Sequence, residues 1–373
     1  METYRFSSKL REHDREYLIQ TTNDVNLGSV LMTVYVNGVP AETVTCPHPS
    51  EINPQEILSF VKVAHGEKKK EIEKLLQVYR EVTTEGNPEM MYHLGTTFFY
   101  KGFYEEAKGL FRAVVQLQPT NHQACNFFGM SELALGNPEQ AIAAASRAVE
   151  QRPGYADYRN NLAEALVASG AADKAIIELE QTLEINMYYA DAYFNLGLAR
   201  IQQEVNNPNR ERLAATVKEI TDNFNRASLI YANFKGKVFE EGMQALAGYD
   251  LVRALSVFKG IREEKKDAHR QEFAAFYMKF VMYPNWVNEK AIADRIAFLK
   301  AELAKNPAYV DLSVELAQCY LEQSRMVWKE GMKQLQKTSG INPSLRKISS
   351  ALEEADDAYG YMARTLNNLT ERG

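Results

Sequence analysis

A thiol and an imidazole stand two residues apart in the stretch Cys46-Pro47-His48. A cysteine beside a histidine base can act as a nucleophile, and the same pair can ligate a metal ion. Side chains two residues apart at a strand end share a face, but they do not have to meet. We therefore interpret the pair as a half-buried thiol and a loop histidine. An enzyme would need a cleft that brings Cys46, His48 or His269 together with carboxylates.

The sequence motifs of the common enzyme classes are missing from the chain. It contains no GxxxxGK[ST] loop, no GxSxG elbow, no HExxH helix and no paired CxxC. The sequence therefore gives no basis for phosphate binding by a P-loop, for a serine nucleophile on an elbow turn or for zinc-dependent hydrolysis. His93 has no second histidine at ligand spacing on its expected helix. We predict no catalytic residue, no cofactor and no metal site.

Composition and charge narrow the class of protein further. The chain has 373 residues, of which 45% are hydrophobic, and its net charge is -6. An acidic protein is not generally attracted to phosphate backbones, so we expect no nucleic acid partner. The three cysteines, at 46, 125 and 319, lie far apart, which favours a reducing compartment. With no apolar export signal and no membrane-spanning stretch, we expect a cytoplasmic protein without membrane insertion.

The elements that would position these side chains begin with strands. Residues 17–21, 30–36 and 44–46 each alternate between apolar and polar side chains, which is typical of half-buried strands. Asn37-Gly38 lies between the last two runs and readily takes the positive φ angles of a two-residue hairpin turn. The pattern predicts a three-stranded antiparallel meander.

A long helix should cover one face of this sheet. Asn53, Pro54 and Glu56 have the spacing of a capping box, and the apolar positions from Ile57 to Ala64 recur at helical intervals. The helix is expected to continue to about Tyr79. We interpret the lysine run 68–70 within it as a solvated face, because flanking glutamates offset its charge.

From about residue 88 the sequence repeats itself. Small residues recur every 34 positions inside apolar helical patterns, at Gly95, Gly129, Ala163 and Gly197. Alanines, aromatic residues and closing prolines recur with them, among them Ala107, Phe111, Pro119, Ala141, Ala145 and Pro153. In type and spacing these residues resemble the tetratricopeptide repeat, clearly over 88–203 and weakly over 204–343. The resemblance implies stacked helix pairs, because no single unit of this length can bury its own apolar face.

The resemblance also implies a binding surface on the first helix of each pair. In the family these helices line a concave groove that holds a peptide. The corresponding residues here are Tyr92, His93, Thr96, Tyr100, Asn126, Phe127, Met130, Asn160, Asn161, Glu164, Phe194, Asn195 and Leu198. Asn161 and Asn195 would hold a peptide backbone, because one amide can both donate and accept. Lysine and arginine are absent from these places, which argues against a clamp for acidic C-termini.

Together these patterns predict a mainly α fold. We expect a right-handed tetratricopeptide-type α-solenoid with a small N-terminal α+β module, made of the three-stranded meander and the long helix. The expected divisions are the module at 1–84, regular repeats at 85–203, degenerate helical repeats at 204–343 and a capping helix at 344–373. Within the degenerate part, Phe273 to Met282 and Ala291 to Leu303 are expected to be helical.

A repeat surface without catalytic residues favours a non-enzymatic adaptor or scaffold. Its groove would bind a protein or peptide partner, and the N-terminal sheet could support self-association through an exposed strand edge. One alternative is a regulatory protein that senses a peptide or small ligand and uses the N-terminal module as its output. A second alternative is an enzyme that uses the repeats only to dock a substrate.

Overall fold

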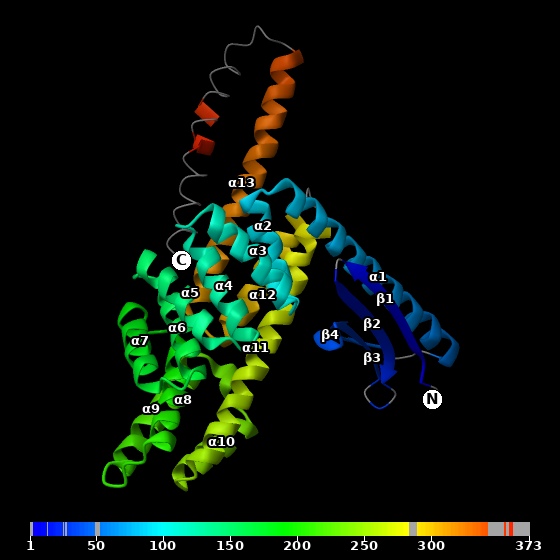
Figure 1. Cartoon of the computed structure of the whole chain (residues 1–373). Coiled ribbons are helices and arrows are strands. Elements are labelled where there is room, and N and C mark those ends of the chain that lie inside the picture. Colours follow the sequence, from blue (N-terminus) through cyan, green and yellow to red (C-terminus); the bar gives the residue numbers. More distant parts are fainter. Residues whose placement is uncertain are drawn as a thin grey trace. The chain divides into compact units, whose positions relative to one another are not determined.

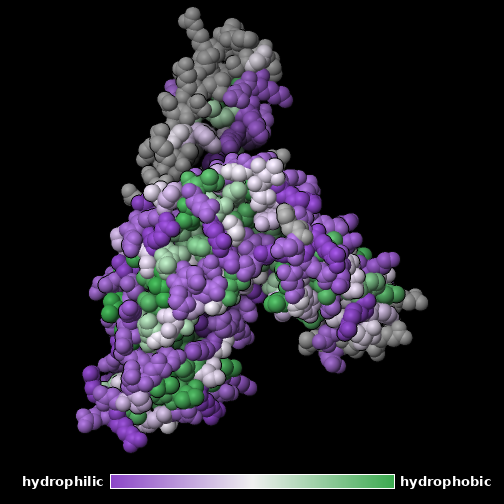
Figure 2. Space-filling model, viewed as in Figure 1, coloured by the Kyte–Doolittle hydropathy of each residue, from purple (hydrophilic) through white to green (hydrophobic). Residues whose placement is uncertain are grey.

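The computed structural model describes residues 3–12, 14–24, 26, 28–48, 53–282, 289–341, 354–355 and 358–360 (Figure 1). The chain forms two compact units, one made of Met1–Pro153 with Gly260–Trp286 and the other of Gly154–Lys259 with Val287–Gly373. We call them unit 1 and unit 2. Figure 2 shows a largely hydrophilic surface with scattered hydrophobic patches. No helix of the described residues is long and apolar enough to cross a membrane.

The N-terminal sheet is antiparallel and has the strand order β1-β2-β3-β4. Its strands are β1 (Arg5–Glu12), β2 (Arg15–Asp24), β3 (Ser29–Val36) and β4 (Val39–Pro47). The sheet therefore has one strand more than the three predicted. β1 escaped prediction because it is an edge strand whose outer face carries charged residues such as Arg5, Lys9 and Arg11, which hide the apolar alternation. The predicted turn is confirmed, since Asn37 and Gly38 both have positive φ, at 50° and 83°.

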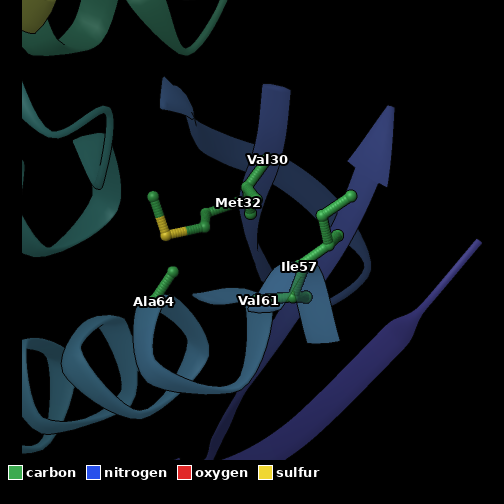
Figure 3. Close-up of a cluster of buried hydrophobic side chains, with 5 residues drawn as sticks. All are labelled: Val30, Met32, Ile57, Val61 and Ala64. Carbon is green, nitrogen blue, oxygen red and sulfur yellow. The ribbon is translucent and has the colours of Figure 1, made fainter. Parts of the chain in front are cut away.

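Helix α1 (Pro54–Glu85) covers one face of this sheet. The predicted capping box is present: the backbone N–H of Glu56 donates to Oδ1 of Asn53, and the N–H of Asn53 donates to the Glu56 carboxylate. Figure 3 shows Ile57, Val61 and Ala64 of α1 facing β3, where they share a buried cluster with Val30 and Met32. The apolar stripe predicted for this helix is therefore the one that closes the small core.

Helix pairs follow α1 in tandem, which confirms the mainly α repeat fold. Unit 1 holds α2 (Pro88–Tyr100), α3 (Tyr104–Leu117), α4 (His122–Ala134) and α5 (Pro138–Gln151). Unit 2 holds α6 (Ala156–Ala168), α7 (Ala172–Ile185), α8 (Ala190–Asn206), α9 (Leu213–Ile230), the short 3-10 helix η1 (Ala232–Phe234) and α10 (Lys237–Ala247). The later helices are α11 (Leu251–Met282), α12 (Glu289–Lys305) and α13 (Val310–Ile341).

Two sets of small residues set the geometry of the repeats. A Cβ atom built on Gly95 would lie 2.9 Å from the ring of Phe111, and one on Gly242 would lie 2.6 Å from Phe258. The paired helices therefore approach closely only because these positions lack a side chain. Turn glycines form the second set: Gly102, Gly136 and Gly170 recur every 34 residues with φ near 80°.

The regular period breaks in the fourth helix pair. Glu204 stands where the next turn glycine would fall, and α8 runs on to Asn206 instead of ending. In the first pair Gly95 faces Phe111, and the same spacing would place the partner of Gly197 at residue 213. Gly197 instead faces Phe224, eleven residues further along the chain. The insertion predicted at 204–210 is thus helical in its first part and a loop in the rest.

The helix predicted at 273–282 is confirmed as the last part of a longer helix, α11. It is one helix of 32 residues that begins in unit 2 and ends in unit 1. The intervening sequence, IREEKKDAHRQE, contains no proline or glycine, and Arg270 forms an ion pair with Asp267 one turn earlier. Nothing in that stretch ends a helix, so it continues.

The lysine run of α1 is not wholly solvated, so that interpretation was wrong for Lys68. Its Nζ donates to Glu42 of β4 at 3.1 Å and to Glu71 at 3.1 Å. Lys101, at the end of α2, donates to Glu42 at 2.7 Å and also contacts Glu71. Three of these side chains are almost fully buried, Glu71 only partly. Two cations and two anions therefore form a neutral network that ties β4, α1 and α2 together.

The electrostatics of the network follow from its composition. Burial alone would raise the pKa of Glu42, but the ammonium groups of Lys101 and Lys68 outweigh it and hold that pKa below its ordinary value. Burial would lower the pKa of Lys101, yet Glu42 and Glu71 raise it above its ordinary value. Glu42 and Lys101 therefore both stay charged at neutral pH.

A second buried carboxylate joins the sheet to α3. Glu106 accepts from the guanidinium of Arg15 at 2.8 Å and from the hydroxyl of Tyr17 at 2.6 Å. Burial, reinforced by the Glu106 charge, raises the pKa of Tyr17 far above its ordinary value, so this hydroxyl remains a donor. At the far end of α1, Tyr79 meets the ring of Phe98 edge-on at 5.4 Å. The module and the first helix pair are therefore one packed body.

In the C-terminal part, the described residues agree with the predicted helices. The expected helix 291–303 lies within α12, and the long helix after Asn306-Pro307 is α13. Asn306 is buried, and its Oδ1 accepts from the backbone N–H of Ala232, which joins the α12–α13 turn to η1 within unit 2. The predicted capping helix at 344–373 lies outside the described residues, apart from two short helical pieces at 354–355 and 358–360.

Candidate protein-binding surface

The predicted groove residues of unit 1 lie on the first helices of two consecutive pairs. Tyr92, His93, Thr96 and Tyr100 belong to α2, and Asn126, Phe127 and Met130 belong to α4. Thr96 and Asn126 are buried, His93 is exposed, and the other four are half-buried. The side chains that a partner could reach are therefore mostly aromatic.

These aromatic side chains form one cluster around Phe127. Its ring lies 5.9 Å from Tyr92, 6.1 Å from Tyr100 and 5.2 Å from Phe111, with the last pair stacked. The first two pairs meet edge to face, which is a favoured geometry for aromatic rings. The cluster is rigid and partly accessible, and both properties suit a surface that anchors apolar side chains of a partner.

Part of this surface is covered by the chain itself. The ring of Phe273 on α11 stacks on Tyr100 at a centroid distance of 4.9 Å. One turn away, the guanidinium of Arg270 donates to the hydroxyl of Tyr104 at 2.9 Å. Gln271 reaches the backbone carbonyl of Thr43 at 3.4 Å. The second half of α11 therefore occupies the Tyr100 end of the aromatic surface, whereas Tyr92 and His93 lie on the preceding turns of α2.

The predicted groove residues of unit 2 have a different environment. On α6, Asn160 is buried, while Asn161 and Glu164 are half-buried. The amide of Asn195 on α8 donates to Asn160 Oδ1 at 2.9 Å and to Glu164 Oε1 at 3.1 Å. Both amide protons of Asn195 are therefore used within the fold, and Asn161 and Glu164 are the polar groups that remain closest to the surface.

Two of the predicted groove residues on α8, Phe194 and Leu198, lie in the core of unit 2. Phe194 is stacked on Phe234 of η1 at 4.4 Å and meets Phe224 edge-on at 5.0 Å. Leu198 is also fully buried. Sequence reasoning could not foresee this, because the residues that cover the face of α8 come from the inserted and degenerate segments beyond residue 213.

The thiol and the imidazole of the N-terminal segment contact different groups. Cys46 Sγ lies 4.0 Å from the carbonyl of Pro47, and the His48 ring meets Phe60 edge-on at 6.0 Å. Cys46 does line a cavity together with Glu67 and Glu71, as the enzyme alternative requires. The Glu71 carboxylate, however, is held by Lys68 and Lys101. The side chain of His269 lies outside the described residues.

Among the side chains that the structure describes, no group of three or more histidine, cysteine, aspartate or glutamate residues has a geometry that could hold a metal ion. The thiol of Cys125 is buried near Arg147 and Gln151, and burial raises its pKa. It is therefore a poor nucleophile and a poor metal ligand in this environment.

The helices form tandem antiparallel pairs. Small residues let the two helices of a pair pack closely, and glycines with positive φ form turns between them. This arrangement defines an α-helical repeat protein. Residues 128–190 match the family model of the tetratricopeptide repeat. Over residues 128–190, the tetratricopeptide repeat that the sequence pattern predicted is therefore confirmed.

Several solved structures are similar to parts of the chain. A crystal structure of MamA is 26% identical, covers 40% of this chain and 82% of its own, and has a TM-score of 0.35. A second crystal structure of MamA is 23% identical over 44% and 89%, with a TM-score of 0.36. TTC0263, a thermophilic tetratricopeptide-repeat protein of Thermus thermophilus, is 18% identical over 63% and 100%, with a TM-score of 0.33.

Proposed function

We propose that this protein is a non-enzymatic adaptor that binds a protein partner on the first-helix face of its repeats. The observation that carries the proposal is the partly accessible aromatic cluster of Tyr92, Tyr100 and Phe127 in unit 1. Rigid aromatic side chains supply large contact areas at little conformational cost, and they are enriched at protein interfaces. The half-buried Asn161 and Glu164 of unit 2 would give polar contacts to a second segment of a partner.

The packing of the N-terminal module supports an adaptor over a sensor. A sensor that uses this module as its output requires the module to change position when a ligand binds. The Glu42 and Glu106 interactions instead hold it against α2 and α3 through buried charges. A fixed module can present its own contacts beside those of the repeats, as a scaffold for two partners requires.

The proposal is tested by site-specific photocrosslinking in cells of the source organism. His93→p-benzoylphenylalanine places the reactive group at the exposed edge of the aromatic cluster, and Tyr188→p-benzoylphenylalanine serves as an exposed control in the turn after α7. We expect a discrete crosslinked protein from position 93 that position 188 does not give. Tyr92→Ser should weaken that crosslink severalfold.

Identical crosslinking patterns at the two positions would argue that the cluster is ordinary surface. The same conclusion would follow if Tyr92→Ser left the crosslink at full strength. Asn161→Ala tests the polar part separately. Asn195 is unsuitable for this purpose, because its amide is a buried donor and its removal would also destabilise unit 2.

A further inference from the structure

A cavity of about 240 Å³ opens between the edge strand β4 and helix α1. Its lining is mostly apolar and includes Met32, Val44, Cys46, Phe60 and Val63, together with the charged side chains Glu67, Lys68 and Glu71. Pockets for whole small molecules usually measure roughly 300 to 1,000 Å³. The size therefore suits one or two side chains of a peptide better than a complete small ligand.

The backbone beside this cavity is the outer edge of the sheet, and within unit 1 Gln271 of α11 contacts it at Thr43. β4 is the last strand of the sheet, and no strand of the described residues pairs with its outer side. The carbonyl of Thr43 points outward, where it meets Gln271, and the N–H of His48 points inward to Gly28. Since backbone groups alternate along a strand, the N–H and C=O groups of Thr45 also face outward.

Two further observations point to a ligand. Among the described residues Nε2 of His48 is buried without a hydrogen-bond partner, and its ring packs against Phe60 of the cavity wall. Val63 is 58% exposed although it lines an apolar cavity. A buried ring nitrogen without a partner and an apolar wall open to water both cost free energy. A bound chain would relieve the exposure of Val63 and could supply a partner for His48.

The charge at the cavity favours a basic occupant. Lys68 and Lys101 are balanced by Glu42 and Glu71 within the buried network. Glu67 also lines the cavity and is exposed, so the lining carries more negative than positive charge. A basic side chain on a bound peptide would therefore be attracted to Glu67.

We propose that the groove between β4 and α1 binds an extended peptide that adds to β4 as a fifth strand. The peptide places one apolar side chain in the cavity and a basic side chain beside Glu67. Side chains of a strand alternate between its faces, so these two residues are separated by one residue, in the pattern apolar-x-basic. The site is distinct from the repeat surface, and it gives the N-terminal module a partner class of its own.

The probe is a fluorescein-labelled heptapeptide, Thr-Lys-Thr-Phe-Thr-Lys-Thr, which presents the pattern in both chain directions. We expect saturable binding to the full-length protein by fluorescence anisotropy. Val63→Lys, which blocks the cavity and repels the peptide, should weaken binding about tenfold, as loss of one buried apolar side chain would. The matched control is Leu58→Lys, at an exposed apolar position of α1 that does not line the cavity.

Two further experiments distinguish strand addition from nonspecific hydrophobic binding. N-methylation of the two threonines that flank phenylalanine removes backbone donors, and it should weaken binding at least tenfold. Glu67→Lys should weaken the lysine peptide and strengthen a version with glutamate in both lysine places. Equal binding by Val63→Lys and Leu58→Lys, or full binding by the methylated peptide, would overturn the proposal. So would a concentration-dependent dimer that takes the edge and excludes the peptide, and none of these outcomes bears on the repeat surface.

Discussion

Replacing Lys101 with methionine should destabilise unit 1 strongly. The side chain is 2% exposed, and its ammonium group lies 2.7 Å from Glu42. Removing one partner of a buried ion pair typically costs about 3 to 5 kcal/mol, because an uncompensated charge remains. Here Glu42 keeps Lys68 as a second partner at 3.1 Å, so the lower end, about 3 kcal/mol, applies.

The matched control is Lys69→Met on helix α1. Lys69 is 42% exposed and lies 3.6 Å from Glu73, and exposed pairs contribute roughly 0 to 1 kcal/mol. The double variant Lys101→Met with Glu42→Leu should cost less than Lys101→Met alone, because it removes the charge that the single change leaves behind. Native-state hydrogen exchange of the β4 and α1 amides measures these differences locally.

The same network predicts the response to acid. The folded pKa of Glu42 is held below its unfolded value by Lys101 and Lys68, against the effect of burial. The contribution of Glu42 to stability is therefore complete above its unfolded pKa of about 4.3, and it is lost as the pH falls through the folded pKa. Glu42→Gln should flatten the acid limb of the stability curve. A cost for Lys101→Met no larger than that of Lys69→Met would refute the reasoning on the buried network.

Three other predictions follow from single contacts. Gly102→Ala should lower the melting temperature more than Gly136→Ala: both have φ near 80°, but only a Cβ on Gly102 would meet a backbone atom, Ala41 O, at 2.3 Å. Equal shifts in melting temperature would contradict this prediction and would show that the sheet moves to make room for the Cβ atom. Burial, with a smaller effect of Lys69, lowers the pKa of His65, so stability should fall as the pH drops below about 6.5, and His65→Gln should remove that slope in urea titrations at several pH values. Phe273→Ala should speed hydrogen exchange in residues 260–282 by freeing the contact on Tyr100, whereas Phe298→Ala on α12 should leave it unchanged; protection that survives Phe273→Ala would mean that other contacts hold α11.

Local patterns in the sequence were sufficient for the elements that depend on neighbours in the chain. The 34-residue period, the Asn37-Gly38 turn and the capping box at Asn53 each involve residues a few positions apart or one unit apart. Periodicity and turn chemistry act over that range, so the repeat family and most helices could be predicted from sequence. β1 could not, because its charged outer face masks the alternation.

The accessibility of the site residues was decided only by tertiary structure. Lys68 was interpreted from sequence as solvated, yet it is buried with Lys101 against Glu42 of β4, which lies 26 and 59 positions away from them. Tyr100 meets Phe273 from the second half of α11, and Phe194 meets Phe234 from a segment outside the regular repeats. Burial depends on which distant segment packs over a face, and a local pattern carries no information on that. The sequence therefore determined the repeat scaffold and its first-helix face, and long-range packing decided which of those residues still reach the surface.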